Sequence, residues 1–298
     1  MSRAPTVSVV IPTWNRATLL PMAVRSVLEQ TFADLELLVV DDGSDDATAE
    51  CLDAITDARL RIVRLPHTGN IARTRNAGAD LATGRFLCFL DSDDVWLPHK
   101  LEVQIEVSAR SNDSWSYTRY EHIDESGCRI AARSGEWQGP SGRIALALIR
   151  TQASASVVTV LVPRQLFEEL SGFDEDPRIR EDHEFLVRLA SRADAIAIPE
   201  CLALVRHHAG RSSGARRGPD PFLQSAHTHE KLLTWLEDPV LRRAARRERA
   251  HHLAEAGAAH MRAGSARAAV ACFVASAAGG AAPRRWLSAV ARGTGMRT

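Results

Sequence analysis

The sequence predicts an α/β protein with a doubly wound sheet, followed by a helical segment. Short apolar runs alternate with segments of helical periodicity over the first 100 residues, and two of these runs end in acidic clusters. After residue 220 the strand pattern gives way to Ala, Arg, Leu and His in helical periodicity. We therefore predict a sheet domain within residues 1–210, followed by a helical extension.

Strands are expected where apolar residues run without alternation, because the strands of a parallel sheet are covered on both faces. These runs are residues 7–11, 36–40, 60–65 and 86–90, with shorter strands at 115–120, 157–162, 195–198 and 202–206. Helices are expected between them, where apolar residues recur every three or four positions. These segments are residues 19–28, 47–55, 71–81, 98–108, 163–170 and 181–190. Residues 210–218, rich in Gly, Ser and Arg, predict a loop, and residues 221–292 predict two to four helices.

Composition excludes several classes of protein. Hydrophobic residues make up 45% of the chain and charged residues 25%, which is ordinary for a globular protein. The sequence contains no run of about 18–20 apolar residues, and its N-terminus lacks the apolar core of a signal peptide. The five cysteines form no CxxC pair, so we expect reduced thiols in the cytoplasm and no zinc site.

Charge is balanced overall but unevenly distributed. The chain has 37 basic and 37 acidic residues, which gives no sign of nucleic acid as a partner. Residues 1–210 carry 22 basic and 31 acidic side chains, whereas residues 211–298 carry 15 and 6. The two parts therefore present different surfaces.

The two acidic clusters follow predicted strands, where open α/β sheets bind their ligands. In Asp91-Ser92-Asp93-Asp94, alternate carboxylates point the same way in extended backbone, so Asp91 and Asp93 can converge on Mg²⁺ or Mn²⁺. In Asp41-Asp42-Gly43-Ser44, a carboxylate can accept from a nucleobase N–H or a ribose hydroxyl. The alternative for both clusters is a solvated turn that caps the next helix.

Three further segments carry polar side chains. Arg73 and Asn76 share a helical face, and Arg73 could pair with a phosphate or lie on a solvated face. Residues 181–184 could supply a general base or only a helix cap, and residues 206–208 hold two histidines that could complete a metal site or be structural. The chain has neither GxxxxGK[ST] nor GxGxxG, so a P-loop and a nicotinamide cofactor are not expected.

The order of the motifs resembles that of the family 2 glycosyltransferases of the GT-A fold. The matching segments are Val-Ser-Val-Val-Ile-Pro-Thr-Trp-Asn-Arg at 7–16, then 30–32, 41–44, 70–78, 89–94, 172–175, 181–182 and 206–208. The resemblance covers residues 5–213 and implies a GT-A glycosyltransferase domain at residues 1–213, followed by a helical extension at residues 214–298. It implies a Rossmann-like mixed sheet flanked by helices and an inverting transferase that uses a nucleotide-diphosphate sugar with a divalent metal, Mn²⁺ or Mg²⁺. Because the family mostly uses UDP-sugars, a UDP-sugar is the expected donor.

The resemblance also implies roles for individual residues. Asp182 would be the catalytic base, with Glu181 beside it, and Asp93 would bind the metal. His208 would meet the metal or the diphosphate, with His207 as the competitor for this role. The residues expected to contact the nucleotide sugar are Pro12, Asn15, Arg16, Asp42, Arg73, Asp91 and Ser92. Ser171 and Ile71 replace frequent glycines of the family.

Two other functions compete with the transferase. One is a non-catalytic protein that binds nucleotide sugars on the same fold. The other is a nucleotidyltransferase, which normally needs a Gly-rich basic loop where this chain has residues 12–16. The acceptor is left open among glycans, lipid-linked sugars, proteins and small molecules, with cell-surface polysaccharide or glycoconjugate synthesis as the expected setting.

The helical extension contains a basic face made by Arg242, Arg243, Arg246 and Arg247. One interpretation is an element that binds the acceptor or makes peripheral contact with anionic lipid at the inner face of the membrane. The other is a solvated helix face that packs on the catalytic domain. The sequence leaves the role of residues 214–298 and the oligomeric state open.

Overall fold

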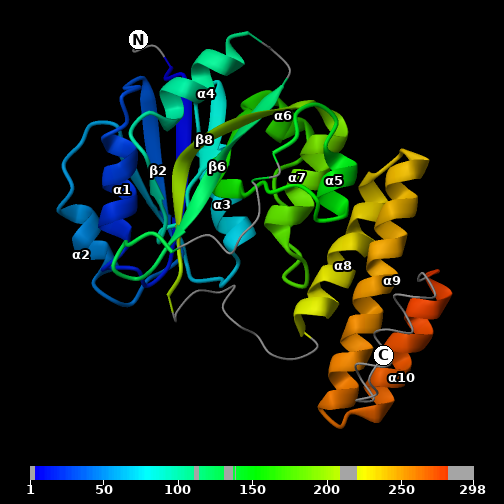
Figure 1. Ribbon diagram of the computed structural model, residues 1–298. Coiled ribbons are helices and arrows are strands. Elements are labelled where there is room, and N and C mark those ends of the chain that lie inside the picture. Colours follow the sequence, from blue (N-terminus) through cyan, green and yellow to red (C-terminus); the bar gives the residue numbers. More distant parts are fainter. Residues whose placement is uncertain (1–3, 111–113, 131–136, 138, 209–219, 281–298) are drawn as a thin grey trace. The chain divides into compact units, whose positions relative to one another are not determined.

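The computed structural model describes residues 4–110, 114–130, 137, 139–208 and 220–280, and Figure 1 shows the course of the chain. These residues build one mixed sheet of eight strands in the spatial order β3-β2-β1-β4-β7-β6-β8-β5. In chain order the strands are β1 (Val7–Thr13), β2 (Leu35–Asp41), β3 (Leu60–Arg64), β4 (Phe86–Phe89), β5 (Val95–Trp96), β6 (Trp115–Ile123), β7 (Val160–Pro163) and β8 (Ala195–Arg206). The predicted α/β fold with a mixed sheet and C-terminal helices is confirmed.

The first four strands in space are parallel. β1 lies between β2 and β4, and its register with β2 runs from Val7 opposite Leu35 to Thr13 opposite Asp41. Every residue of β1 and β2 is buried, which explains why both strands are mainly apolar without alternation, with Ser8 and Glu36 as polar residues within the runs. Because these strands are parallel, their carboxyl ends meet at one edge of the sheet.

β8 is a single strand of 12 residues, where the sequence pattern predicted two strands separated by Pro199. Its ladder with β6 passes from Ile198 directly to Cys201, so Pro199 and Glu200 bulge out of the register. Proline has no N–H to donate, and a bulge lets the strand continue past it. β8 also pairs with β5, an antiparallel two-residue strand that was not predicted.

Helices flank the sheet (Figure 1). They are α1 (Leu20–Leu28), α2 (Thr48–Asp53), α3 (Ile71–Leu81), α4 (Lys100–Ser108) and α6 (Arg164–Glu169). α3 approaches the strands closely at Gly78, where an added Cβ would lie 2.5 Å from Val10 Cγ1 and 2.9 Å from Val40 Cγ2. Residues 157–159, predicted as strand, form a 3₁₀ turn before β7.

The chain divides into two compact units. The first holds the whole sheet, and the second consists of residues 145–152, 176–188 and 210–298. The second unit contains α5 (Ala145–Ile149), the start of α7 (Glu181–Arg192), α8 (Asp220–Trp235), α9 (Pro239–Arg262) and α10 (Ala266–Ala278). The domain boundary predicted at residues 213 and 214, the loop at 210–218 and the last predicted helical residues, 281–292, lie outside the described residues.

Small side chains let the helices of the second unit pack closely. α9 packs along both α8 and α10 (Figure 1). An added Cβ at Gly257 would lie 2.8 Å from the Phe273 ring, and the buried Ser276 hydroxyl donates to the Ala250 carbonyl at 2.6 Å. The Ala-rich composition of this segment therefore serves close helix packing.

The predicted basic face of α9 is divided between two roles. The Arg242 guanidinium donates to the carbonyls of Leu233 and Leu236, at 2.6 and 2.7 Å, and so closes the C-terminal end of α8. Arg243, Arg246 and Arg247 are exposed. None of the described helices is long and apolar enough to cross a membrane. Contact of the basic face with a membrane surface stays a prediction.

Four histidines, His183, His229, His251 and His252, gather within the second unit and are called the histidine cluster below. Ring centroids lie 6.0 Å apart for His183 and His229, 5.2 Å for His229 and His252, and 5.7 Å for His251 and His252. His183 Nε2, His251 Nδ1 and His252 Nδ1 are buried without a hydrogen-bond partner in the part of the chain that the structure describes. For His183 and His252 this burial favours the neutral ring.

We expect acid to destabilise this unit. Burial, reinforced by the positive charge of Arg180, lowers the pKa of His183 to about 3. Burial and the neighbouring His229 lower the pKa of His252 to about 3, and burial also lowers the pKa of His229 despite the negative charge of Glu248. The unfolded chain, with histidine pKa values near 6.5, binds protons more readily, so stability present at neutral pH is lost as pH falls below about 6.5.

The free energy of unfolding should fall by about 1.4 kcal/mol per pH unit for each buried histidine. Urea titrations between pH 7.5 and 5 measure this slope. His252→Phe should reduce it, whereas His99→Gln, a change at an exposed side chain outside the unit, should not. A flat stability profile over this range would contradict the expectation.

Candidate active site

Three loops follow the carboxyl ends of β2, β1 and β4, which are neighbours in the sheet. They carry Asp42 directly after Asp41, the last residue of β2, Asn15 and Arg16 after β1, and the acidic loop of residues 91–94 after β4. Pro12 lies within β1, opposite Val40, and is buried. The sequence therefore brings these predicted site residues to one edge of the sheet, where open α/β sheets bind ligands.

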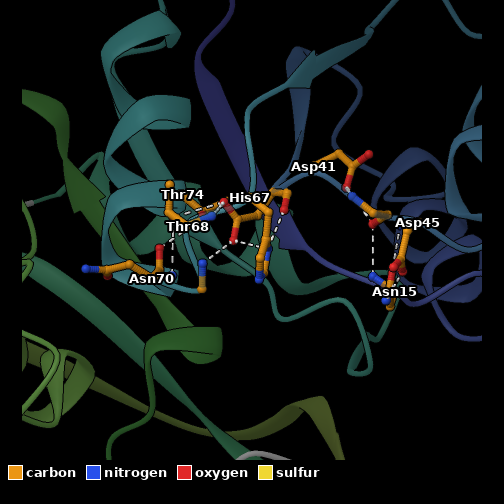
Figure 2. Close-up of polar contacts among 10 residues, drawn as sticks. Asn15, Asp41, Asp45, His67, Thr68, Asn70 and Thr74 are labelled. Atoms are coloured by element: carbon orange, nitrogen blue, oxygen red, sulfur yellow. Dashed lines mark hydrogen bonds and ion pairs between the residues drawn. The ribbon is translucent and has the colours of Figure 1, made fainter.

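The first two loops are joined by paired hydrogen bonds (Figure 2). Asn15 donates through Nδ2 to Asp45 Oδ1 at 2.6 Å and accepts from the Asp45 amide through Oδ1 at 2.9 Å. The backbone amides of Asn15 and Arg16 donate to the hydroxyls of Ser44 and Thr48, each at 2.9 Å. The side chain of Asn15, predicted to contact the donor, is thus used to connect loops, and its φ of 50° follows from that tight turn.

Asp42 shapes the loop that precedes α3. Its carboxylate is nearly buried and accepts from the Thr68 amide, the Thr68 hydroxyl and the Gly69 amide at 3.0, 3.0 and 2.9 Å. His67 Nδ1 lies 2.8 Å from the Asp42 carbonyl oxygen, and Figure 2 shows His67, Thr68 and Asn70 together at this point. Asp42 was predicted to contact the nucleobase of the donor. These hydrogen bonds show that its carboxylate also holds the loop before α3 in shape.

An aromatic platform lies beside this loop. The rings of Trp14 and His67 stack with centroids 4.6 Å apart and planes 21° apart, and 46% of Trp14 is exposed. Neither residue was predicted from the sequence to take part in the site. An exposed ring next to strand ends can stack on another flat ring system, so Trp14 joins the candidate site.

The acidic loop gathers three carboxylates. Oxygens of Asp91, Asp93 and Asp94 lie within 4.8 Å of one another, and Ser92 between them is buried. Asp93 Oδ2 lies 2.8 Å from His208 Nε2. This donor set fits a hard divalent cation such as Mg²⁺ or Mn²⁺, because oxygen ligands dominate and a neutral imidazole can add a nitrogen.

Arg206, at the end of β8, fixes the shape of the acidic loop. Its backbone amide donates to Asp94 Oδ1 at 2.8 Å, and its Nε donates to the Asp93 carbonyl at 3.0 Å. Its Nη1 donates to the carbonyls of Asp124 and Glu125, each at 3.1 Å. The buried guanidinium therefore ties the acidic loop to the turn after β6.

The two histidines after β8 lie on opposite sides of the chain. His208 meets Asp93, while His207 Nε2 lies 2.8 Å from Nδ1 of His122 on β6. Side chains two residues apart in extended backbone share a side, so His208 follows Arg206 toward the acidic loop. Of the two candidates for the metal or the diphosphate, His208 is the one that contacts a predicted metal ligand.

On α3 the structure adds an arginine that the sequence analysis missed. The predicted phosphate ligand Arg73 is exposed, whereas Arg75 is 2% exposed and donates from Nη2 to Asp91 Oδ1 at 2.7 Å. Arg75 shares the buried face of α3 with Ala72 and Gly78, and that spacing was the available signal.

The predicted base Asp182 belongs to the second unit, in the first turn of α7. Its Oδ1 accepts from the His183 amide at 2.6 Å, and the residue is partly exposed. The N-terminal end of a helix stabilises the negative charge of a carboxylate.

Similarity to known proteins agrees with this geometry. The sequence profile of glycosyl transferase family 2 matches residues 8–169. The Escherichia coli UDP-Glc:alpha-D-GlcNAc-diphosphoundecaprenol beta-1,3-glucosyltransferase WfgD is 38% identical over 120 residues, which are 40% of this chain and 47% of that protein. An uncharacterized glycosyltransferase of Rickettsia felis is 34% identical over 209 residues, 70% of this chain and 34% of that protein. The chain thus spans less than half the length of each of these relatives.

Solved structures share the fold. The S. aureus TarS 1-349 structure in complex with UDP-GlcNAc superposes with a TM-score of 0.63 at 18% identity, covering 97% of this chain and 80% of that one. Mannosyltransferase PcManGT from Pyrobaculum calidifontis, in complex with GDP-Man and Mn²⁺, gives 0.59 at 20% identity with the same coverage.

The sheet order and the loops at its carboxyl edge define a GT-A-like α/β protein. The extent of the profile match then fixes the family: the chain belongs to glycosyl transferase family 2.

Proposed function

We propose that the protein is an inverting glycosyltransferase that moves a sugar from a nucleotide-diphosphate donor to an acceptor hydroxyl. The observation that carries the proposal is the acidic loop of residues 91–94, which Arg75, Arg206 and His208 hold at the carboxyl edge of the sheet. The family supplies the reaction class. UDP-sugar is the proposed donor, since WfgD is named for UDP-Glc and TarS is solved with UDP-GlcNAc.

The chain's own residues supply binding and charge. Trp14 offers a flat ring on which the nucleobase of the donor would stack, and Asp42 keeps the adjoining loop in shape. Asp93 and His208, with Asp91 nearby, would hold a divalent cation that supplies positive charge to the departing diphosphate. Arg75, whose side chain is buried, keeps the partly exposed Asp91 in place through an ion pair.

Asp182 is the proposed general base. It would take the proton from the acceptor hydroxyl while that oxygen attacks the anomeric carbon and the nucleoside diphosphate leaves from the opposite face. The glycosidic bond forms as the bond to the diphosphate breaks, so the anomeric configuration inverts. Such a displacement needs no covalent bond to the enzyme.

The proposed acceptor is a lipid-linked sugar, because WfgD is named for a GlcNAc-diphosphoundecaprenol acceptor. The proposed setting is the synthesis of a surface polysaccharide or glycoconjugate at the inner face of the membrane. The basic residues Arg243, Arg246 and Arg247 are the proposed contact with anionic lipid.

A donor screen tests the proposal. The full chain is incubated with UDP- and GDP-sugars, Mn²⁺ and a GlcNAc-diphosphate lipid, and the release of nucleoside diphosphate is measured. We expect release with one UDP-sugar, loss of release in EDTA, and a product of inverted anomeric configuration by NMR. Binding of UDP by calorimetry without turnover on any acceptor would favour the non-catalytic alternative, and a retained configuration would refute the inverting mechanism.

A further inference from the structure

Two side chains of α8 form hydrogen bonds with the carbonyl oxygen and the N–H of one peptide unit just before α7. Gln224 donates from Nε2 to the carbonyl oxygen of Ile179 at 3.1 Å. Thr228 accepts the N–H of Arg180 on its Oγ1 at 2.8 Å. That carbonyl and that N–H belong to the same peptide unit, which lies two residues before Asp182. All of these residues lie in the second unit.

The geometry of this contact is fixed on the α8 side. Gln224 and Thr228 are four residues apart and therefore share one helical face. The Thr228 hydroxyl donates its proton to the Gln224 carbonyl at 2.8 Å, which leaves an oxygen lone pair for Arg180. Thr228 is fully buried, so water does not compete for this oxygen.

The contact meets a need of α7. The N–H groups at a helix start have no partner within the helix, and a start without external partners frays. The Arg180 carbonyl already accepts from the Glu184 amide at 2.9 Å, so this residue begins the hydrogen bonding of α7. Thr228 thus satisfies a donor that the helix itself cannot satisfy.

The next turn of α7 is attached to the same neighbour. Glu184 and Arg188 form a buried ion pair through two contacts of 2.7 Å. The Arg188 guanidinium lies 4.9 Å from the ring centroid of Trp235, at the end of α8. α8 therefore contacts the base-bearing segment both before and after Asp182.

We propose that Gln224 and Thr228 are positioning residues for Asp182, so that α8 is part of the catalytic apparatus. The inference rests on the proposed role of Asp182 as general base. A base works only within hydrogen-bond reach of the hydroxyl that it deprotonates, and displacements of about 1 Å can cost about 100-fold in rate. If the hydrogen bonds of Gln224 and Thr228 to the preceding peptide unit are lost, the turn that carries Asp182 is no longer held in position.

Kinetics of Thr228 variants test the proposal. Thr228→Val keeps the shape and removes the acceptor, and we expect kcat to fall about tenfold or more. The Kd for UDP with Mn²⁺ should stay unchanged, because the residues proposed to bind the donor lie in the first unit. Thr228→Ser should restore kcat. Thr234→Val is the matched control, since Thr234 is exposed on the same helix and donates to the Lys231 carbonyl.

A double-mutant cycle separates the proposed role of Asp182 as general base from the proposed positioning role of Thr228. If Asp182→Asn alone leaves kcat intact, the proposed base is wrong. If Asp182→Asn lowers kcat but Thr228→Val does not, the positioning role is wrong. If both act, Thr228→Val should have no further effect in the Asp182→Asn protein, and an additive loss would refute coupling. Gln224→Met provides the same comparison through the other hydrogen bond if Thr228→Val does not fold, and an unchanged kcat there would refute the role.

Discussion

Asp182→Asn is expected to lower kcat by about 10³-fold, within the range that general-base catalysis contributes. The amide keeps the size of the side chain and can still accept from the His183 amide, so the fold of the turn should persist. It cannot take a proton from the acceptor at neutral pH. Steady-state kinetics with a saturating UDP-sugar measure the loss, and the KM for the donor should change little.

The neighbouring carboxylate provides the control. Glu181→Gln removes a charge from the same helical turn and should leave kcat within about threefold, because the effect of one charge at a helix end is small. Full activity of Asp182→Asn together with an inactive Glu181→Gln would transfer the role of base to Glu181.

Asp93→Asn is expected to have the second large effect, a loss of Mn²⁺ affinity and a fall in kcat of about 10²-fold or more. Three carboxylates within 4.8 Å attract a divalent cation, and Asp93 also meets His208. Replacing one anionic oxygen by an amide weakens the site without changing its shape. Calorimetric titration of Mn²⁺ measures the affinity, and kinetics across Mn²⁺ concentrations show whether excess cation restores the rate.

Asp53→Asn is the matched change elsewhere. Asp53 lies on α2, is exposed and pairs with Arg64. Exposed ion pairs contribute little, so both Mn²⁺ affinity and kcat should remain unchanged. Equal Mn²⁺ affinity in Asp93→Asn and the unsubstituted protein would remove Asp93 from the metal site.

The parallel half of the sheet could be predicted from sequence because its signal is local. β1 and β2 are apolar at almost every position and end in recognisable polar loops. β5 and β8 were harder to predict from the sequence. A two-residue strand such as β5 shows no periodicity, and a proline such as Pro199 in β8 normally ends a strand. Only the pairing of β8 with β6 shows that a bulge absorbs the proline.

Some residues of the candidate site could likewise be predicted from the sequence, whereas others could not. The acidic loop and His208 follow from motif order, but the preference for Arg75 over Arg73 depends on which face of α3 is buried. The association of residues 176–188 with α8 and α9 depends on contacts between distant segments. The boundary predicted at residue 213 follows the extent of the motif pattern along the chain, which carries no information on packing between distant segments.

The alternation at the end of β8 makes this strand sensitive to length. Arg206 and His208 both reach the acidic loop because they are two positions apart, and His207 reaches His122 because it lies between them and points to the other side. Loss of a single residue between the bulge and the strand end would exchange the partners of the two histidines. We therefore expect the segment that follows Cys201 to tolerate insertions and deletions less well than the loops around it.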